Sequence, residues 1–78
     1  MAEEIKLRNL YDVQQLLKTY NIYVYVGKRI WDIELMALEL DNIYHAGLIS
    51  QKVYLSAKVV LRHEHEIEEL ELGKWTKN

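Results

Sequence analysis

Two glycines divide this chain into three stretches, and that division limits its fold more than any other feature. On either side of Gly27 and Gly47, apolar residues recur every three or four positions, which is the spacing of one face of an α-helix. Proline is absent, so no proline breaks these stretches. The expected helices run from about Leu10 to Tyr20, from Lys28 to Ala46 and from Gln51 to Leu70. We therefore predict an all-α domain, a compact three-helix array.

The ends of these helices carry residues that suit helix caps. Asn9 is placed to cap the first helix, Gly47 fits a left-handed cap after the second, and Ser50 can begin the third. Six apolar residues on the inward stripes are expected to form the core: Leu17, Ile33, Met36, Leu40, Val60 and Leu61. Ile67 of the third helix is also expected to face the core, and Leu38 and Tyr44 are expected to widen the stripe of the second helix.

The segment IYVYV, residues 22–26, is expected to be a short extended connector between the first two helices. Its β-branched residues disfavour helix. Ile22, Val24 and Val26 would face the core, so Tyr23 and Tyr25 would project together on the other side, about 6.6 Å apart. Because the sequence holds no second strand, water, a helix or another copy must pair with this backbone. Pairing with another copy would make a homo-oligomer.

The 78 residues suffice for one domain, residues 1–78, with ends near 1–8 and 72–78 expected to be mobile. The absence of cysteine excludes disulfides and thiolate metal sites. No apolar run approaches the length of a membrane span, and the first residues lack the apolar core of a signal peptide. We therefore expect a cytoplasmic protein that does not enter a membrane.

The net charge of −2 is unevenly distributed along the chain. Residues 5–29 contain five basic residues and one acidic residue, whereas EHEIEELE, residues 64–71, contains five glutamates and no basic residue. A polyanion could therefore approach only part of this surface.

Three stretches occur in a characteristic order: YDVQQLLKTY, then GKRIWDIELMALELDNIY, then GLIS. Together they resemble the YqgQ-like family, small uncharacterised proteins of Gram-positive bacteria, over roughly Leu10 to Arg62. The resemblance implies a compact three-helix fold. It also implies single-stranded nucleic-acid binding, which has been suggested for this family, and it carries over no catalytic residue.

Aromatic and basic residues gather in and beside the extended connector. Neighbouring exposed rings can stack on unpaired bases while cations neutralise phosphates. The candidate residues are Lys18, Tyr20, Tyr23, Tyr25, Lys28 and Arg29. Lys28 and Arg29 stand at the start of a helix, where the macrodipole disfavours positive charge. Such an unfavourable placement is typical of functional sites and therefore points to a function. In the alternative interpretation, Lys28 pairs with Asp32, Arg29 pairs with Asp32 or faces solvent, and the tyrosines cover a small core.

A second set of candidates lies on the third helix. Tyr54, Lys58 and Arg62 follow one another at four-residue intervals along one edge and could extend the same groove. The alternative is an ordinary solvated helix face, with Arg62 paired to Glu66.

Motifs for catalysis or cofactor binding are absent. The serines belong to no nucleophile motif, HEHEI lacks the second histidine of H-E-x-x-H, and the phosphate-loop and dinucleotide fingerprints are missing. We therefore expect no enzymatic activity, no cofactor and no metal. The predicted function is weak, sequence-tolerant binding of single-stranded RNA or DNA. The alternative is a non-enzymatic helical module that binds a protein partner.

Overall fold

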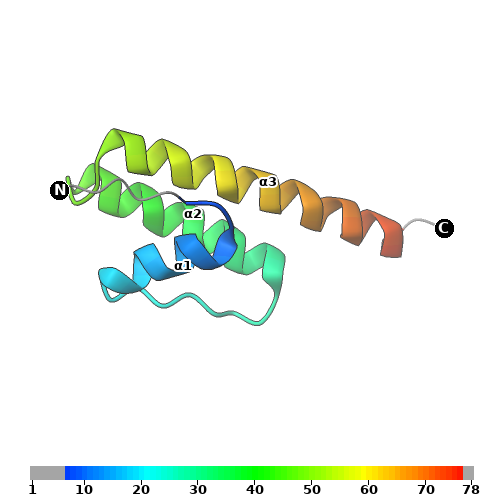
Figure 1. Ribbon diagram of the computed structural model, residues 1–78. Coiled ribbons are helices and arrows are strands. Elements are labelled where there is room, and N and C mark those ends of the chain that lie inside the picture. Colours follow the sequence, from blue (N-terminus) through cyan, green and yellow to red (C-terminus); the bar gives the residue numbers. More distant parts are fainter. Residues whose placement is uncertain (1–6, 77–78) are drawn as a thin grey trace.

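Three helices follow one another along the chain: α1 (Leu10–Thr19), α2 (Arg29–His45) and α3 (Gln51–Thr76). The computed structural model describes residues 7–76, and their side chains from residue 7 to residue 72. In Figure 1, α2 and α3 run side by side in opposite directions, and α1 packs against both. The described residues contain no β-strand. The predicted all-α fold, three helices with an extended connector between the first two, is confirmed.

Helix α1 is bounded at both ends by asparagine. At its start, the side chain of Asn9 accepts a hydrogen bond from the backbone N–H of Asp12 at 3.0 Å, as predicted for an N-cap. At its end, Asn21 adopts a φ of 64°, and the N–H of Ile22 returns to the carbonyl of Leu17. This left-handed residue closes the last turn and directs the chain into the connector.

The corner between α2 and α3 has the predicted cap residues. Gly47 adopts a φ of 80°, and the N–H of Leu48 donates to the carbonyl of Ile43 at 2.9 Å. Ser50 then accepts a hydrogen bond from the N–H of Val53 at 3.2 Å, which begins α3. Because both caps act within a few residues, the corner is built by local interactions.

All six predicted core residues are buried, and Val13 and Ala57 are buried with them. Of the three other apolar residues expected on the inward faces, two do not face the core: 54% of Leu38 and 39% of Ile67 is exposed. Leu38 lies on the side of α2 opposite to its buried stripe. Ile67 lies near the level at which α2 begins, so α2 covers little of this part of α3. The third residue, Tyr44, is half-buried.

Helix α3 ends at Thr76, six residues later than the predicted end at Leu70. Good helix formers fill residues 64–72, and a glycine inside a helix costs only about 1 kcal/mol relative to alanine, so Gly73 does not end the helix. Of the ends that were expected to be mobile, residues 1–6 and 77–78 lie outside the described residues. At the N-terminal end, Leu7 packs against the core, and the N–H of Arg8 donates to Asp12 Oδ2 at 2.8 Å.

The connector shows the predicted alternation over most of its length. Ile22 and Val24 pack against the core, while Tyr23 and Tyr25 are 68% and 85% exposed. Val26 was expected to face the core, but its side chain is exposed. Beyond Tyr25 the chain turns towards α2 at a glycine with a φ of 103°, which ends the alternation.

Among the described residues, no helix is both long and apolar enough to cross a membrane.

Candidate nucleic-acid interface

Four exposed residues form what we call the connector surface: Lys18, Tyr23, Tyr25 and Lys28. Lys18 lies in the last turn of α1, and Lys28 directly precedes α2. Within the described residues, neither lysine pairs with a carboxylate. The Nζ atom of Lys28 lies 5.4 Å from the centre of the Trp31 ring, over its face. The connector surface therefore combines two exposed rings with two cations whose charges are not neutralised.

Asp32 does not make the ion pair with Lys28 that the alternative interpretation predicted. Its carboxylate is buried and accepts a hydrogen bond from the backbone N–H of Val26. The carboxylate lies near the start of α2, where negative charge is favourable. Asp32 thus fastens the end of the connector to α2, and Lys28 stays exposed.

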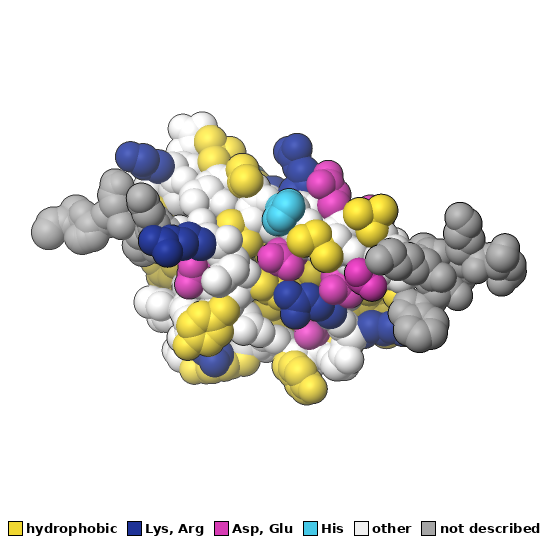
Figure 2. All heavy atoms as spheres, turned by 45° about the vertical axis from the view of Figure 1, so that its right-hand side comes forward, with side chains coloured by type: hydrophobic (Ala, Val, Ile, Leu, Met, Phe, Trp, Pro, Cys, Tyr) yellow, Lys and Arg dark blue, Asp and Glu magenta, His cyan; other side chains and the backbone are white. Residues whose placement is uncertain are grey.

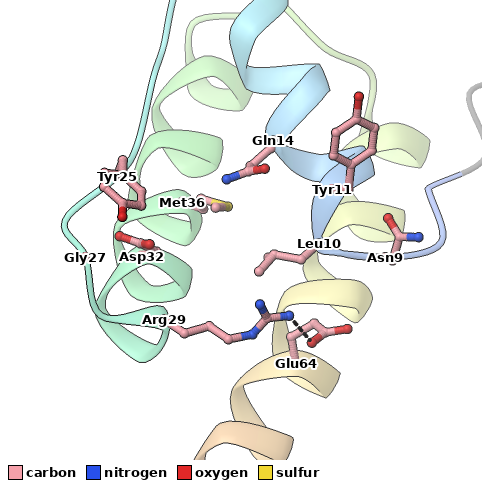
Figure 3. Close-up of a pocket in the computed structure, with 10 residues that line it drawn as sticks. All are labelled: Asn9, Leu10, Tyr11, Gln14, Tyr25, Gly27, Arg29, Asp32, Met36 and Glu64. Carbon is pink, nitrogen blue, oxygen red and sulfur yellow. Dashed lines mark hydrogen bonds and ion pairs between the residues drawn. The ribbon is translucent and has the colours of Figure 1, made fainter.

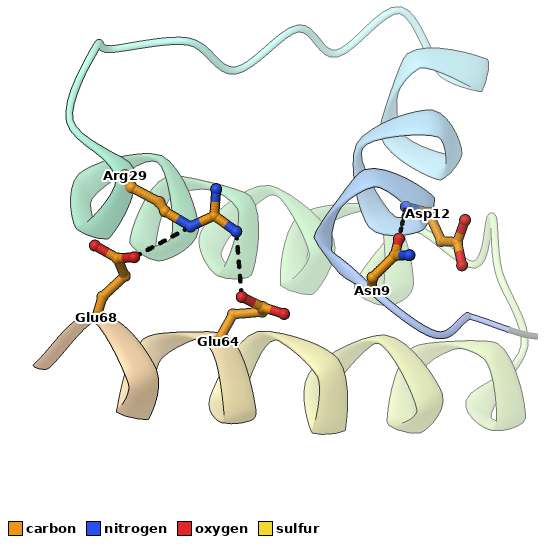
Figure 4. A network of polar contacts seen from close by, with 5 residues as sticks. All are labelled: Asn9, Asp12, Arg29, Glu64 and Glu68. Atoms are coloured by element: carbon orange, nitrogen blue, oxygen red, sulfur yellow. Dashed lines mark hydrogen bonds and ion pairs between the residues drawn. The ribbon is translucent and has the colours of Figure 1, made fainter. Parts of the chain in front are cut away.

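Arg29 faces α3 and is engaged in two ion pairs there. Its Nη2 atom lies 3.3 Å from Glu64 Oε1 and its Nε atom lies 3.2 Å from Glu68 Oε2, as Figure 4 shows. Both carboxylates are largely shielded by surrounding atoms. Arg29 therefore neutralises part of the acidic segment, and a phosphate would have to compete with two glutamates for it.

Tyr20, the remaining candidate near the connector, is half-buried. Its hydroxyl donates to the backbone carbonyl of Leu48 at 3.1 Å. This bond joins the end of α1 to the corner between α2 and α3, which gives Tyr20 a structural role whatever it does in binding.

Two of the three candidates on α3 belong to a polar cross-link with α2. The Tyr54 hydroxyl donates to Asp41 Oδ1 at 2.7 Å, and Lys58 Nζ lies 3.3 Å from the same oxygen. The hydrogen bond from Tyr54 and then the interaction with Lys58 hold the pKa of Asp41 below its usual value, whereas the bond to Asp41 raises the pKa of Tyr54. The Tyr54 ring also stacks on Tyr44, with centroids 4.0 Å apart.

Arg62, the third candidate on α3, is exposed and makes no ion pair within the described part of the chain, so the alternative pairing with Glu66 is not formed. Lys58 and Arg62 line a hollow between α2 and α3, together with Glu34 and His65. Neither α1 nor the connector contributes to this hollow. This hollow is therefore lined by α2 and α3 alone.

Two adjoining hollows lie beneath the connector. The larger hollow, about 520 Å³, is bounded by the start of α1, the end of the connector, the first turns of α2 and Glu64 of α3 (Figure 3). The smaller hollow, about 230 Å³, lies between α1 and the middle of the connector. They share Gln14, Tyr25 and Met36. Sequence reasoning did not single out Gln14, because a polar residue on an amphipathic helix ordinarily faces solvent.

Apolar side chains also reach the surface away from the connector. On the outward side of α2, Trp31, Leu35 and Leu38 are spaced so that they lie on one stripe. On the face shown in Figure 2, hydrophobic side chains lie among charged ones and do not merge into one patch. Because its three apolar side chains are exposed, the outward side of α2 is a second candidate surface, for a protein partner.

The comparisons with known proteins name no activity. The YqgQ-like family model matches residues 7–67. A Bacillus subtilis (strain 168) protein described as "Uncharacterized protein YqgQ" is 43% identical over 60 residues, which cover 77% of this chain and 84% of that protein. This chain belongs to the YqgQ-like family.

Proposed function

We propose that this protein binds single-stranded RNA or DNA through its connector surface, weakly and with little sequence preference. The observation that carries the proposal is the exposure of two neighbouring rings, Tyr23 and Tyr25, on the same side of an extended segment. A tyrosine that serves only as cover for the core buries most of its ring, and these two do not. Exposed rings at this spacing suit successive unpaired bases, and each stack contributes about 1–3 kcal/mol.

The charges around the rings support binding of modest strength. Lys18 and Lys28 flank the tyrosines and have no carboxylate partner in the part of the chain that the structure describes, so both can contact phosphates. Arg29 reduces the repulsion from the acidic segment by pairing with two of its glutamates. Because only a few phosphates can be neutralised at once, we expect a Kd of about micromolar order. A cytoplasmic location and the absence of a catalytic step are part of this proposal.

The test is fluorescence anisotropy of labelled single-stranded oligonucleotides at several salt concentrations. Tyr23→Ala should weaken binding about equally for all sequences without changing the salt dependence, because stacking uses the face that every base has. Tyr23→Phe is the matched control, since it keeps the ring and should keep the affinity. Lys28→Ala should flatten the salt dependence by about one unit per lost phosphate contact. Arg62→Ala, on the separate hollow of α3, should change neither.

Two results would contradict the proposal. A folded protein that binds no oligonucleotide at low salt does not bind nucleic acid through this surface. A preference for duplex would mean that exposed tyrosines are not the readers, because paired bases do not offer their faces for stacking.

The outward side of α2 supports the second candidate function, docking of a protein partner. Its Trp31, Leu35 and Leu38 would bury apolar area against such a partner. Salt separates the two functions, because an apolar protein interface responds weakly to ionic strength whereas phosphate contacts respond steeply. Loss of partner binding on Leu38→Ala, with oligonucleotide binding absent, would favour the protein module.

A further inference from the structure

We propose that the larger hollow beneath the connector takes one unpaired base that carries an exocyclic amino group: adenine, cytosine or guanine. This inference rests on the proposed function and gives the connector surface a single position at which bases are distinguished. The two hollows adjoin and share Tyr25, so a strand stacked on the connector has a path by which its next base can enter.

Gln14 is the polar group at the centre of this site. Its side chain is half-buried, extends from α1 towards Met36 and lines both hollows (Figure 3). Within the described residues, its amide makes no hydrogen bond. An amide offers two donors and one acceptor, and each base edge presents a neighbouring donor and acceptor that can match them. A base would therefore give this partly desolvated amide the partner that it lacks.

The remaining lining suits a flat ring. Met36 is fully buried behind the floor of the hollow, which makes this part of the lining apolar and, because a methionine side chain is flexible, able to adjust to a flat ring. Tyr11 and Tyr25 are both highly exposed and lie at the rim, so either ring can cover an inserted base. A planar ligand between these groups buries apolar area on both of its faces. A flexible ligand of similar polarity would not.

Carboxylates on the wall select among the bases. Asp32 accepts the N–H of Val26 with one oxygen, and its second oxygen has no partner within the described residues. Glu64 adds a further carboxylate beside Arg29. These acceptors match an exocyclic amino group, which donates. Uracil and thymine present a carbonyl oxygen at the corresponding position, so an acceptor would face an acceptor.

The test compares oligo(U) with copies that carry one A or one C at the centre, by anisotropy at a single salt concentration. We expect the substituted strands to bind about three- to tenfold more tightly than oligo(U), the range that one net hydrogen bond supplies. Gln14→Leu should abolish this difference and leave the affinity for oligo(U) within about twofold. Gln15→Leu is the matched control, because Gln15 is the adjacent half-buried amide, lines neither hollow and should leave the preference intact.

Free nucleotides separate failure of this inference from failure of the proposed function. AMP and CMP, but not UMP, should shift the NMR signals of the Gln14 amide and the Met36 methyl group. Equal binding of the three strands, or equal loss of preference in both glutamine variants, overturns the inference and leaves strand binding intact. If AMP shifts these signals while no oligonucleotide binds, the hollow is a base site and the connector surface does not bind strands. If neither binds, both proposals fall.

Discussion

Two buried residues on the same helix are expected to respond differently to truncation. Met36 and Leu40 lie one turn apart on α2, and both have an exposed fraction of 0%. Met36 lines both hollows beneath the connector, whereas Leu40 lines none of the three hollows described above. The cost of truncating a buried side chain contains the lost transfer free energy and a second contribution from the cavity left behind. The cavity contribution should distinguish the two positions.

Leu40→Ala leaves a closed cavity in the core, and we expect it to lower the free energy of unfolding by about 4 kcal/mol, in the upper part of the range for such changes. Met36→Ala leaves a space that opens into the neighbouring hollows, which solvent fills, so the cavity contribution is small and we expect a loss of about 2 kcal/mol. For a domain of this size, each kcal/mol lowers Tm by about 4–8 °C, so the difference between the variants is readily measured.

The assay is urea unfolding followed by far-UV circular dichroism, with Leu38→Ala as the control. Leu38 is on the same helix but faces outward, so its truncation should change stability by no more than about 0.5 kcal/mol. A Met36→Ala variant as destabilised as Leu40→Ala would refute the reasoning, because it would mean that the space left by the Met36 side chain does not open into the hollows. A large loss for Leu38→Ala would mean that this face is covered in solution.

Three further changes test two helix caps and one cross-link between helices. Asn9→Ala removes the cap of α1 and should lower the free energy of unfolding by about 1 kcal/mol in thermal melts, whereas Asn9→Asp should keep it. Gly47→Ala should cost about 1 kcal/mol or more because of its φ of 80° alone, since an added Cβ meets open space; a neutral result would contradict this. Because the pKa of Asp41 is lowered on folding, its contribution to stability is present above the unfolded pKa, about 3.9, and is lost as pH falls through the folded value. Asp41→Asn should therefore flatten the loss of stability at acid pH, and an unchanged pH profile would count against the cross-link.

The local features of this fold follow from the sequence alone. The bounds of α1 and α2 and the start of α3 were predicted to within one residue, because apolar periodicity and caps such as Asn9, Gly47 and Ser50 act within a single turn. The exposure of Tyr23 and Tyr25 was predictable for the same reason, since alternate side chains of an extended segment face opposite sides.

The pairing of polar groups was decided by the tertiary structure. Arg29 was assigned to a phosphate or to Asp32, yet it contacts Glu64, 35 residues away, and the Tyr20 hydroxyl bonds a carbonyl 28 residues away. From the sequence alone, several carboxylates are possible partners for a charged side chain on a helix. Only the packing of α2 against α3 selects among them.

The same packing decided which apolar and polar residues line the candidate site. Leu38 and Ile67 fit a helical stripe in the sequence, but a residue is buried only where another element covers it, and neither position is well covered. The sequence indicates an ordinary surface residue of α1 at Gln14, yet its side chain lines two hollows beneath the connector. Periodicity specifies which side of a helix is apolar, whereas the position and length of the neighbouring segments determine how far that side is covered and where space remains.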